Sequence, residues 1–251
     1  MSTVLERRAQ RETSAPDATA RVVAVAMLWI TAVLLVDAGS TRWTQRGLGI
    51  CTWLVLVWLL RGESPLVRMQ TAVVIVFASI VEYTFSPLLE VYTYRFDNVP
   101  MYVPPGHGLV YLAALAIGRL EWVQAHLRLC TAAVMLGGGA YAAYGLTSAG
   151  RLDVLGAFWF LCLAGFLLWG PSRGLYVGAF LVVTYLEIAG TALGTWTWQA
   201  VDPTGLIPIG NPPSGAAGGY GWFDLAALLL APALLTSWHD LRRRVTRTRA
   251  S

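Results

Sequence analysis

The chain contains no lysine, and it is poor in charge of either sign. Its 251 residues include 18 basic residues, all of them arginine, and 14 acidic ones, so that 13% of the sequence is charged. A soluble domain carries roughly 25%. The hydrophobic share is 56%, and the mean hydropathy is +0.58. So few charges cannot cover a surface that faces water, and we therefore expect an all-α, polytopic membrane protein.

Cysteine and histidine are also scarce. Cys51, Cys130 and Cys162 fall inside apolar runs, and their spacing matches neither a metal motif nor a disulfide framework. No Gly-x-Ser-x-Gly, His-Glu-x-x-His or Asp-rich diphosphate motif is present. The sequence therefore predicts no metal site and no cofactor. The absence of lysine, together with abundant Ala, Gly and Val, indicates a GC-rich bacterial genome.

Long apolar runs dominate the chain. A bilayer-spanning helix needs about 20 mostly apolar residues, and we expect eight such spans, at residues 21–38, 46–61, 68–87, 107–121, 126–146, 153–171, 174–195 and 218–238. The length of the first run suits an uncleaved span rather than a signal peptide. Residues 1–20 are polar and charged, and we expect them to be disordered.

The arginines predict how the spans are oriented. With a cytoplasmic N-terminus and eight crossings, the opposite side holds only Arg42, Arg46, Arg95 and Arg151. The other arginines fall on the cytoplasmic side, including those of the basic tail at 239–251. This positive-inside bias predicts that both termini are cytoplasmic and that the protein lies in the inner (plasma) membrane. The tail is typical of a membrane flank, so the bilayer is the expected partner and nucleic acid is not.

The sequence repeats itself about a hundred residues apart, and a repeat of this kind decides the fold. An apolar helix with a glutamate is followed by two alternating aromatics, a proline-rich turn and a Leu-Ala-Ala-Leu run. The matching segments are Glu82 with Glu187, residues 89–94 with 193–198, 100–106 with 208–214, and 112–115 with 225–228. The expected units are a first four-helix repeat at 21–121 and a second at 122–238.

Four spans per repeat place both halves in the same orientation, as a parallel repeat about an axis along the membrane normal. The loops at 88–106 and 196–217 then become equivalent and extracytoplasmic. Alternating aromatics predict an extended segment in each loop, and the Pro-x-x-x-Pro-Pro elements are expected to be non-helical. Such backbone near membrane depth lines a cavity, so we expect two lids. The alternative is an interfacial aromatic belt.

Two carboxylates lie inside predicted spans. Glu82 and Glu187 sit in the third and seventh spans, where a charge costs roughly 2.5–3.5 kcal/mol at the bilayer centre. Such a group pairs, becomes protonated or faces water. We consider acid–base chemistry and structural hydrogen bonding between helices. Asp37, at the end of the first span, is expected to be solvated.

Aligning the Leu-Ala-Ala-Leu runs pairs His107 with Tyr220 and Tyr111 with Asp224, which predicts an asymmetric pocket between the halves. His107 is a candidate proton shuttle or orienting group, or simply a helix cap. The candidate acid–base residues are Glu82, Glu187, Asp224 and His107. The candidate substrate-binding residues are Tyr92, Tyr94, Tyr111, Trp196, Trp198, Asn211 and Tyr220.

The motif order resembles that of the integral membrane carotenoid-biosynthesis family that includes carotenoid hydratases. That family carries a Glu near a helix end, a Gly-x-aromatic-x-aromatic element and a proline-rich turn. The matching elements are Glu82 and Glu187, the aromatic pairs at 92–94 and 196–198, and the prolines at 100–105 and 208–213. Glu90 replaces the glycine in the first copy, whereas the second copy keeps Gly194. The resemblance implies acid-catalysed addition of water to an isoprenoid alkene.

Three functions fit these residues. The first is a membrane enzyme, a hydratase, isomerase or cyclase, acting on an apolar isoprenoid or lipid. Its buried acids would donate protons, and its aromatic faces would stabilise a carbocation. The second is a transporter or carrier of a lipid-like or proton-coupled solute, since intramembrane carboxylates at a repeat interface are typical of carriers. The third is a non-catalytic assembly factor that uses the lids as a docking surface.

Overall fold

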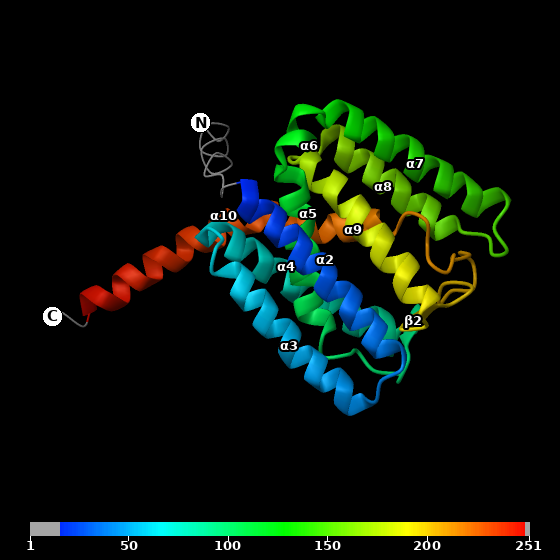
Figure 1. Cartoon of the computed structure of the whole chain (residues 1–251), viewed down its shortest axis with the longest axis horizontal. Coiled ribbons are helices and arrows are strands. Elements are labelled where there is room, and N and C mark those ends of the chain that lie inside the picture. Colours follow the sequence, from blue (N-terminus) through cyan, green and yellow to red (C-terminus); the bar gives the residue numbers. More distant parts are fainter. Residues whose placement is uncertain (1–15, 249–251) are drawn as a thin grey trace.

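The computed structural model describes residues 16–248, which form a bundle of long helices (Figure 1). A helix occupies each of the eight ranges expected from the sequence. These are α2 (Pro16–Ala38), α3 (Arg42–Leu60), α4 (Pro65–Tyr83), α5 (Val103–Arg119), α7 (Leu127–Thr147), α8 (Val154–Trp169), α9 (Arg173–Ala192) and α10 (Ala216–Thr248). Shorter elements are the π-helical turn η1 (Thr84–Leu88), α6 (Glu121–Ala125) and the strands β1 (Tyr92–Tyr94) and β2 (Trp196–Trp198). The helical prediction is confirmed, apart from these two short strands.

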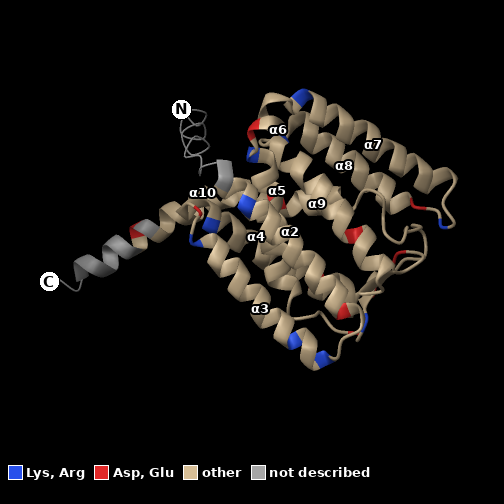
Figure 2. Cartoon of the chain, in the orientation of Figure 1, with Lys and Arg blue, Asp and Glu red and all other residues tan. Residues whose placement is uncertain are grey.

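Five of the helices are long and apolar enough to cross a bilayer. They are Ala18–Ala38, Pro65–Leu88, Leu127–Thr147, Arg173–Ala192 and Ala216–Trp238, whereas α8 is apolar but shorter. Outward-facing leucines are largely exposed, for example Leu28 at 71% and Leu136 at 77%. Charged residues gather toward the two ends of the bundle and are sparse between them (Figure 2). The chain is therefore a multi-pass membrane protein.

The centre of the bundle is made by α5 and α9, which pack closely against each other. A Cβ on Gly178 of α9 would lie 2.1 Å from the carbonyl oxygen of Ala114 on α5. Gly118 and Gly174 meet in the same way farther along the pair. Small residues let helix backbones approach in a bilayer, where no hydrophobic force drives helices together. Helices α4 and α10 form the second closely packed pair.

The two strands pair with each other and join the two long loops. They are antiparallel, with Tyr92 opposite Trp198, Thr93 opposite Thr197, and Tyr94 opposite Trp196. The predicted extended segments are thus confirmed. Because side chains alternate along a strand, all four aromatic rings lie on the same, inner face of the ribbon and are at most 7% exposed. Side chains buried to this extent do not form an interfacial belt.

The backbone takes the same unusual turn two residues before each strand. Gly194 has φ +68° before β2, and Glu90 has φ +51° before β1. Glycine adopts this left-handed conformation readily, whereas another residue pays about 1–2 kcal/mol there. The first loop therefore carries a backbone strain that the second avoids.

Two buried aspartates anchor the loops. Asp37 is fully buried rather than solvated as expected, because its carboxylate accepts hydrogen bonds from the hydroxyls of Tyr102 and Ser40, each at 2.9 Å. Asp153, at the start of α8, accepts from the backbone N–H of Gly156, at 2.9 Å. Its carboxylate also accepts from the backbone amides of Gly210 and Ser214 in the second loop.

Three boundaries differ from the prediction. Helix α2 begins at Pro16, so residues 16–20 are helical, while residues 1–15 lie outside the described part of the chain. Helix α5 begins at Val103, so Pro104 and Pro105 occupy its first turn, where a missing N–H breaks no helical hydrogen bond. The expectation that this Pro-Pro is non-helical was wrong. Helix α10 continues through most of the basic tail to Thr248, and residues 249–251 lie outside the described chain.

Candidate functional site

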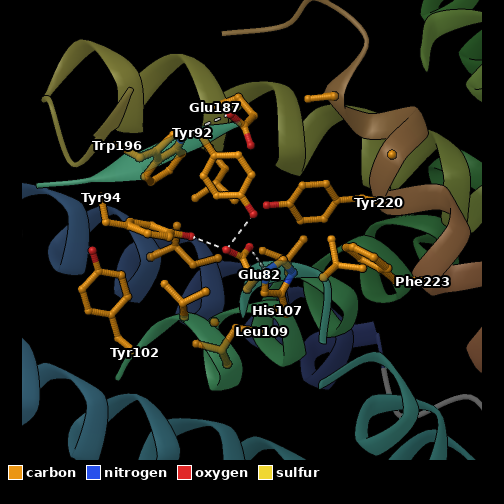
Figure 3. Close-up of a pocket in the computed structure, with 18 of the residues that line it drawn as sticks. Glu82, Tyr92, Tyr94, Tyr102, His107, Leu109, Glu187, Trp196, Tyr220 and Phe223 are labelled. Carbon is orange, nitrogen blue, oxygen red and sulfur yellow. Dashed lines mark hydrogen bonds and ion pairs between the residues drawn. The ribbon is translucent and has the colours of Figure 1, made fainter. Parts of the chain in front are cut away.

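A cavity of about 270 Å³ lies on the inner side of the β1–β2 ribbon, between the two halves of the chain (Figure 3). Its walls come from every long helix except α7, as well as from η1 and both strands. Most lining groups are aromatic or aliphatic, and Glu82, Glu187 and His107 are the ionisable exceptions besides tyrosine. Small-molecule sites are mostly apolar in this way, with a few convergent polar groups.

Glu82 reaches the cavity from the last turn of α4 and is 6% exposed. Its Oε2 accepts hydrogen bonds from the hydroxyls of Tyr92, at 2.9 Å, and Tyr94, at 2.8 Å. Its Oε1 lies 2.7 Å from Nε2 of His107. The carboxylate is therefore held by three side chains that converge on it (Figure 3).

The two tyrosines reach the same oxygen because they occupy alternate positions of β1, on one face of the strand. Burial, followed by the nearby charge of Glu82, raises the pKa of Tyr92 and Tyr94 well above the usual value. Both phenols therefore keep their protons at neutral pH and act as donors.

His107 belongs to the body of α5 rather than to its cap. The helix starts four residues earlier, so the capping alternative was wrong, and the ring is 5% exposed. The imidazole stacks on Tyr220 of α10 with ring centroids 5.1 Å apart and meets the edge of Phe223 at 5.6 Å. Its Nδ1 has no hydrogen-bond partner among the described residues. Depending on which ring nitrogen carries the proton, Nε2 either donates to Glu82 or accepts from it.

Glu187, from α9, faces the cavity from the other half. Its Oε2 accepts hydrogen bonds from the indole Nε1 of Trp196, at 3.1 Å, and of Trp198, at 3.0 Å. The other carboxylate oxygen points into the cavity (Figure 3). The indole of Trp196 fits only because residue 190 is glycine, since a Cβ there would lie 1.9 Å from the ring.

The two carboxylates therefore share a geometry but differ in chemistry. In each half, two aromatic side chains from one strand donate to a single carboxylate oxygen. A tyrosine hydroxyl can both donate and accept, and an imidazole can carry a proton in either direction, whereas an indole N–H only donates. The side chains around Glu82 can therefore pass protons on, while the two indoles beside Glu187 can only donate hydrogen bonds to it.

Tyr111 and Asp224 do not line the cavity, although the sequence placed both on its walls. Each lies one helical turn beyond a residue that does line it, His107 for Tyr111 and Tyr220 for Asp224, and both are buried. Tyr111 packs in a second apolar cluster with Leu175 and Phe223, among other residues. Because side chains four residues apart point the same way but lie a turn apart along the helix axis, the aligned pair sits deeper in the bundle.

The sequence did not single out Tyr176, which belongs to this deeper group. The hydroxyls of Tyr111 and Tyr176 have no hydrogen-bond partner among residues 16–248. Asp224 interacts electrostatically with both. Nothing in the local sequence of Tyr176 marks it, since it appears as one more residue of an apolar helix.

Asn211 also lies away from the cavity, on the exposed outer side of the second loop. Its Oδ1 accepts a hydrogen bond from the backbone N–H of Trp198, at 3.0 Å. It therefore holds β2 in place rather than binding a substrate. Within residues 16–248, no three side chains of His, Cys, Asp or Glu gather as metal ligands.

Several cavity residues were not predicted, because they lie on apolar helix faces with no distinguishing pattern. Trp159 of α8 packs edge-on against Trp198, with centroids 5.7 Å apart. The other additional aromatic residues of the lining are Trp29, Phe77, Phe85, Tyr102, Trp222 and Phe223. They make the cavity more aromatic than the loops alone suggested.

Comparison of the chain with protein-family models, curated proteins and solved structures gives no match.

Proposed function

We propose that this protein is a membrane enzyme that performs acid–base chemistry on an isoprenoid or a related apolar lipid. One observation carries the proposal: two buried carboxylates, Glu82 and Glu187, enter the same aromatic cavity from opposite halves of the chain. Buried carboxylates without a basic partner from lysine or arginine are costly in a bilayer and are usually functional. The resemblance of the motif order to carotenoid hydratases favours an isoprenoid alkene as substrate.

The donors of each carboxylate favour a division of roles. Glu82, connected to Tyr92, Tyr94 and His107, is the proton donor, because its neighbours can return the proton that it loses. Glu187 has an oxygen free toward the cavity and two indole donors that stabilise its negative charge. It is therefore the group that receives a proton or faces a positive charge.

In the proposed reaction, the proton of Glu82 adds to one carbon of an alkene, and the positive charge forms on the neighbouring carbon. The faces of the surrounding tryptophans and tyrosines stabilise that cation. In a hydratase, water then adds to the cation and its surplus proton passes to Glu187. In an isomerase or cyclase, an adjacent carbon loses that proton instead. Proton transfer from Glu187 back to Glu82, by way of the tyrosines or water, restores the starting state.

We also infer that the chain crosses the membrane eight times, as two parallel repeats with both termini in the cytoplasm. The arrangement of the halves supports the repeat, because the antiparallel strand pair is centred on Thr93 and Thr197, which are equivalent in the two copies. The contacts of α4 with α10 and of α5 with α9 are also equivalent under that relation. The matching left-handed turns at Glu90 and Gly194 agree with it.

The arginines support the orientation. Arg119 pairs with Glu63 at 3.1 Å, so it lies at the same end as the turn between α3 and α4. Arg95 and Arg151, by contrast, hydrogen-bond the ends of the β1–β2 ribbon and lie at the opposite end. With the ribbon in the extracytoplasmic half of an inner membrane, most of the arginines fall in the cytoplasm.

A lipid carrier is the second candidate. It is favoured by the hydrogen bonding of Glu82, since both of its oxygens are already engaged in a way that could serve binding alone. A carrier would retain the lipid without changing its covalent structure. The two candidate functions therefore predict different lipid compositions for a cell that lacks the protein.

The test is analysis of lipid extracts from a deletion strain that carries either the wild-type gene or a variant. We expect a precursor to accumulate without the gene and the product to return with the wild type. Glu82→Gln and Glu187→Gln should lower conversion roughly 10²–10⁴-fold. Glu90→Gln, the same change at an exposed carboxylate, is the control, and thermal unfolding of the purified variants checks folding. Unchanged lipids in the deletion strain, with a lipid bound to the pure protein, would favour the carrier.

A further inference from the structure

A second pocket, of about 290 Å³, lies at the beginning of α3, outside the cavity described above. It is lined by Arg42, Gln45, Arg46, Asn98 and Met101. Two of the residues are cationic and none is acidic. They include two of the few arginines that the proposed topology places on the extracytoplasmic side, where the positive-inside rule leaves them unexplained.

The pocket contains polar groups that lack partners. Gln45 is 2% exposed, and the nitrogen of its side-chain amide has no hydrogen-bond partner among the described residues. Asn98 donates to Gln45 at 3.3 Å, and its own carbonyl oxygen is left without a partner. If the oxygen and nitrogen of both side-chain amides are exchanged, Gln45 donates to Asn98, and the unpaired NH₂ donor belongs to Asn98. One NH₂ donor is therefore unpaired in either orientation. A buried donor of this kind costs free energy unless a ligand or water satisfies it.

The two arginines are only partly engaged. Arg42 donates to the carbonyl oxygen of Phe96 at 3.0 Å. Arg46 lies over the ring of Trp43 with its guanidinium carbon 4.5 Å from the ring centroid. No acidic partner of either arginine is found within residues 16–248, so most of their donors are available. Two guanidinium groups beside a buried amide donor suit a phosphate group.

The surroundings of the pocket indicate where that phosphate comes from. Helix α3 presents an apolar face beside it, with Trp43 76% exposed, Ile50 57% and Leu54 65%. A tryptophan stacked under an arginine at a helix end is typical of the membrane interface. An acyl chain can lie along this face while its headgroup occupies the pocket.

We propose that this pocket binds the phosphate of an anionic lipid headgroup, held by Arg42, Arg46 and the amide of Gln45. The site is independent of the chemistry in the cavity. The pocket nevertheless shares a wall with the cavity, because Met101 faces the pocket while the next residues, Tyr102 and Val103, line the cavity. A bound headgroup would thus contact the segment that contributes Tyr102 and Val103 to the cavity wall.

The test is native mass spectrometry of the full-length protein titrated with phosphatidylglycerol or with phosphatidylcholine. The wild type should bind phosphatidylglycerol more tightly, and Arg42→Gln with Arg46→Gln should weaken that binding by about tenfold or more, given the attraction of each arginine for anionic lipid. Arg128→Gln, at an exposed arginine of α7, is the matched control. Gel filtration and thermal unfolding in phosphatidylcholine verify that the double variant folds.

Inorganic phosphate alone separates the two sources of the anion. We expect it to leave the melting temperature of the wild type unchanged at concentrations at which phosphatidylglycerol raises it. Equal stabilisation by free phosphate would overturn the assignment to a lipid. Equal affinity of the wild type and the double variant for phosphatidylglycerol, or equal affinity of the wild type for both lipids, would overturn the site.

Discussion

The surroundings of Glu82 and Glu187 differ, although the backbone presents the two carboxylates in the same way. Each comes from the third long helix of its half, and each accepts two hydrogen bonds at one oxygen from alternate residues of the following strand. The donors are phenols in one half and indoles in the other. The backbone geometry is thus shared, and the proposed division of roles rests on the presence of tyrosine in one half and tryptophan in the other.

The halves also differ in how their loops are held. In the first half, Asp37 binds a serine and a tyrosine side chain, and Arg95 lies nearby. In the second half, Asp153 binds backbone amides across the loop. Backbone contacts constrain the chain regardless of the side chains that it carries. The support of the second loop therefore depends less on the identity of the loop side chains than that of the first.

The largest expected effect comes from removing the paired donors. Tyr92→Phe with Tyr94→Phe leaves Oε2 of Glu82 without a donor, which should destabilise the protein by about 1–3 kcal/mol or more. Each single change should cost less than half of that, because the other hydroxyl remains and the two sites are coupled. The measurement is a double-mutant cycle on thermal unfolding in detergent.

The same cycle with Trp196→Phe and Trp198→Phe compares the two halves. We expect the two pairs of substitutions to affect stability alike and lipid conversion differently. We expect similar non-additivity in unfolding. The phenylalanine variants of the tyrosines should lose lipid conversion more severely, because they also lose groups that can carry a proton. Equal losses of conversion in both cycles would contradict the division of roles.

A substitution beneath Trp196 should have the next largest effect. In Gly190→Ala the new Cβ overlaps the indole ring, which must move away from Glu187, and overpacking of this kind typically costs about 1–3 kcal/mol. Gly137→Ala in α7 is the control, since nothing lies within 4 Å of a Cβ there. That variant should unfold at the same temperature as the wild type or slightly higher. A Gly190→Ala protein as stable as the control would show that Trp196 is not fixed by this contact.

The two left-handed turns give opposite predictions. Glu90→Gly should stabilise the protein, and Gly194→Ala should destabilise it, each by about 1–2 kcal/mol, because only glycine takes a positive φ without strain. Thermal unfolding of both variants tests this. The same sign of change for both would mean that the turns are not equivalent.

The smallest effect concerns the tip of the second loop, which the first loop does not match. The Thr204 hydroxyl, followed by the backbone amides of Ile207, Thr204 and Leu206, lowers the pKa of Asp202 below its usual value. The carboxylate therefore orders the loop fully above about pH 3.9, the ordinary value for Asp, and this contribution is lost as the pH falls through the lowered pKa. Hydrogen exchange of the amides at 204, 206 and 207 should accelerate in Asp202→Asn, whereas the amide of Trp198 should be unaffected.

Much of the fold could be predicted from the sequence, because helices that cross a bilayer are recognisable as long runs of high hydropathy. The extended segments were also predictable, since Tyr92-Thr-Tyr94 and Trp196-Thr-Trp198 alternate with period two. The helical start of α5 was missed because Pro-Pro normally indicates a break, and only the position within the first turn makes it compatible with a helix. The ends of α2 and α10 were missed because hydropathy marks where the apolar run stops, not where the helix stops.

The site was only partly predictable. The repeat identified Glu82 and Glu187 and the four aromatic residues, but not which atoms would meet, because hydrogen bonding depends on how the strands pair. Alignment of the halves placed Tyr111 and Asp224 on opposite walls of the cavity, whereas neither of them lines it. Aligning the two halves of the sequence does not show at which level of the bundle a residue lies. The cavity aromatics such as Trp159 depend on helix rotation, which the uniformly apolar helices do not specify.

The central claim is that Glu82 delivers a proton to a carbon atom of an apolar substrate. The most direct measurement incubates membranes containing the protein in heavy water with the lipid that accumulates in the deletion strain. Mass spectrometry of the product should then show carbon-bound deuterium that does not wash out, and the Glu82→Gln membranes should form almost none of this product. Product that forms in heavy water without carbon-bound deuterium, or at an undiminished rate in the Glu82→Gln variant, would contradict the account.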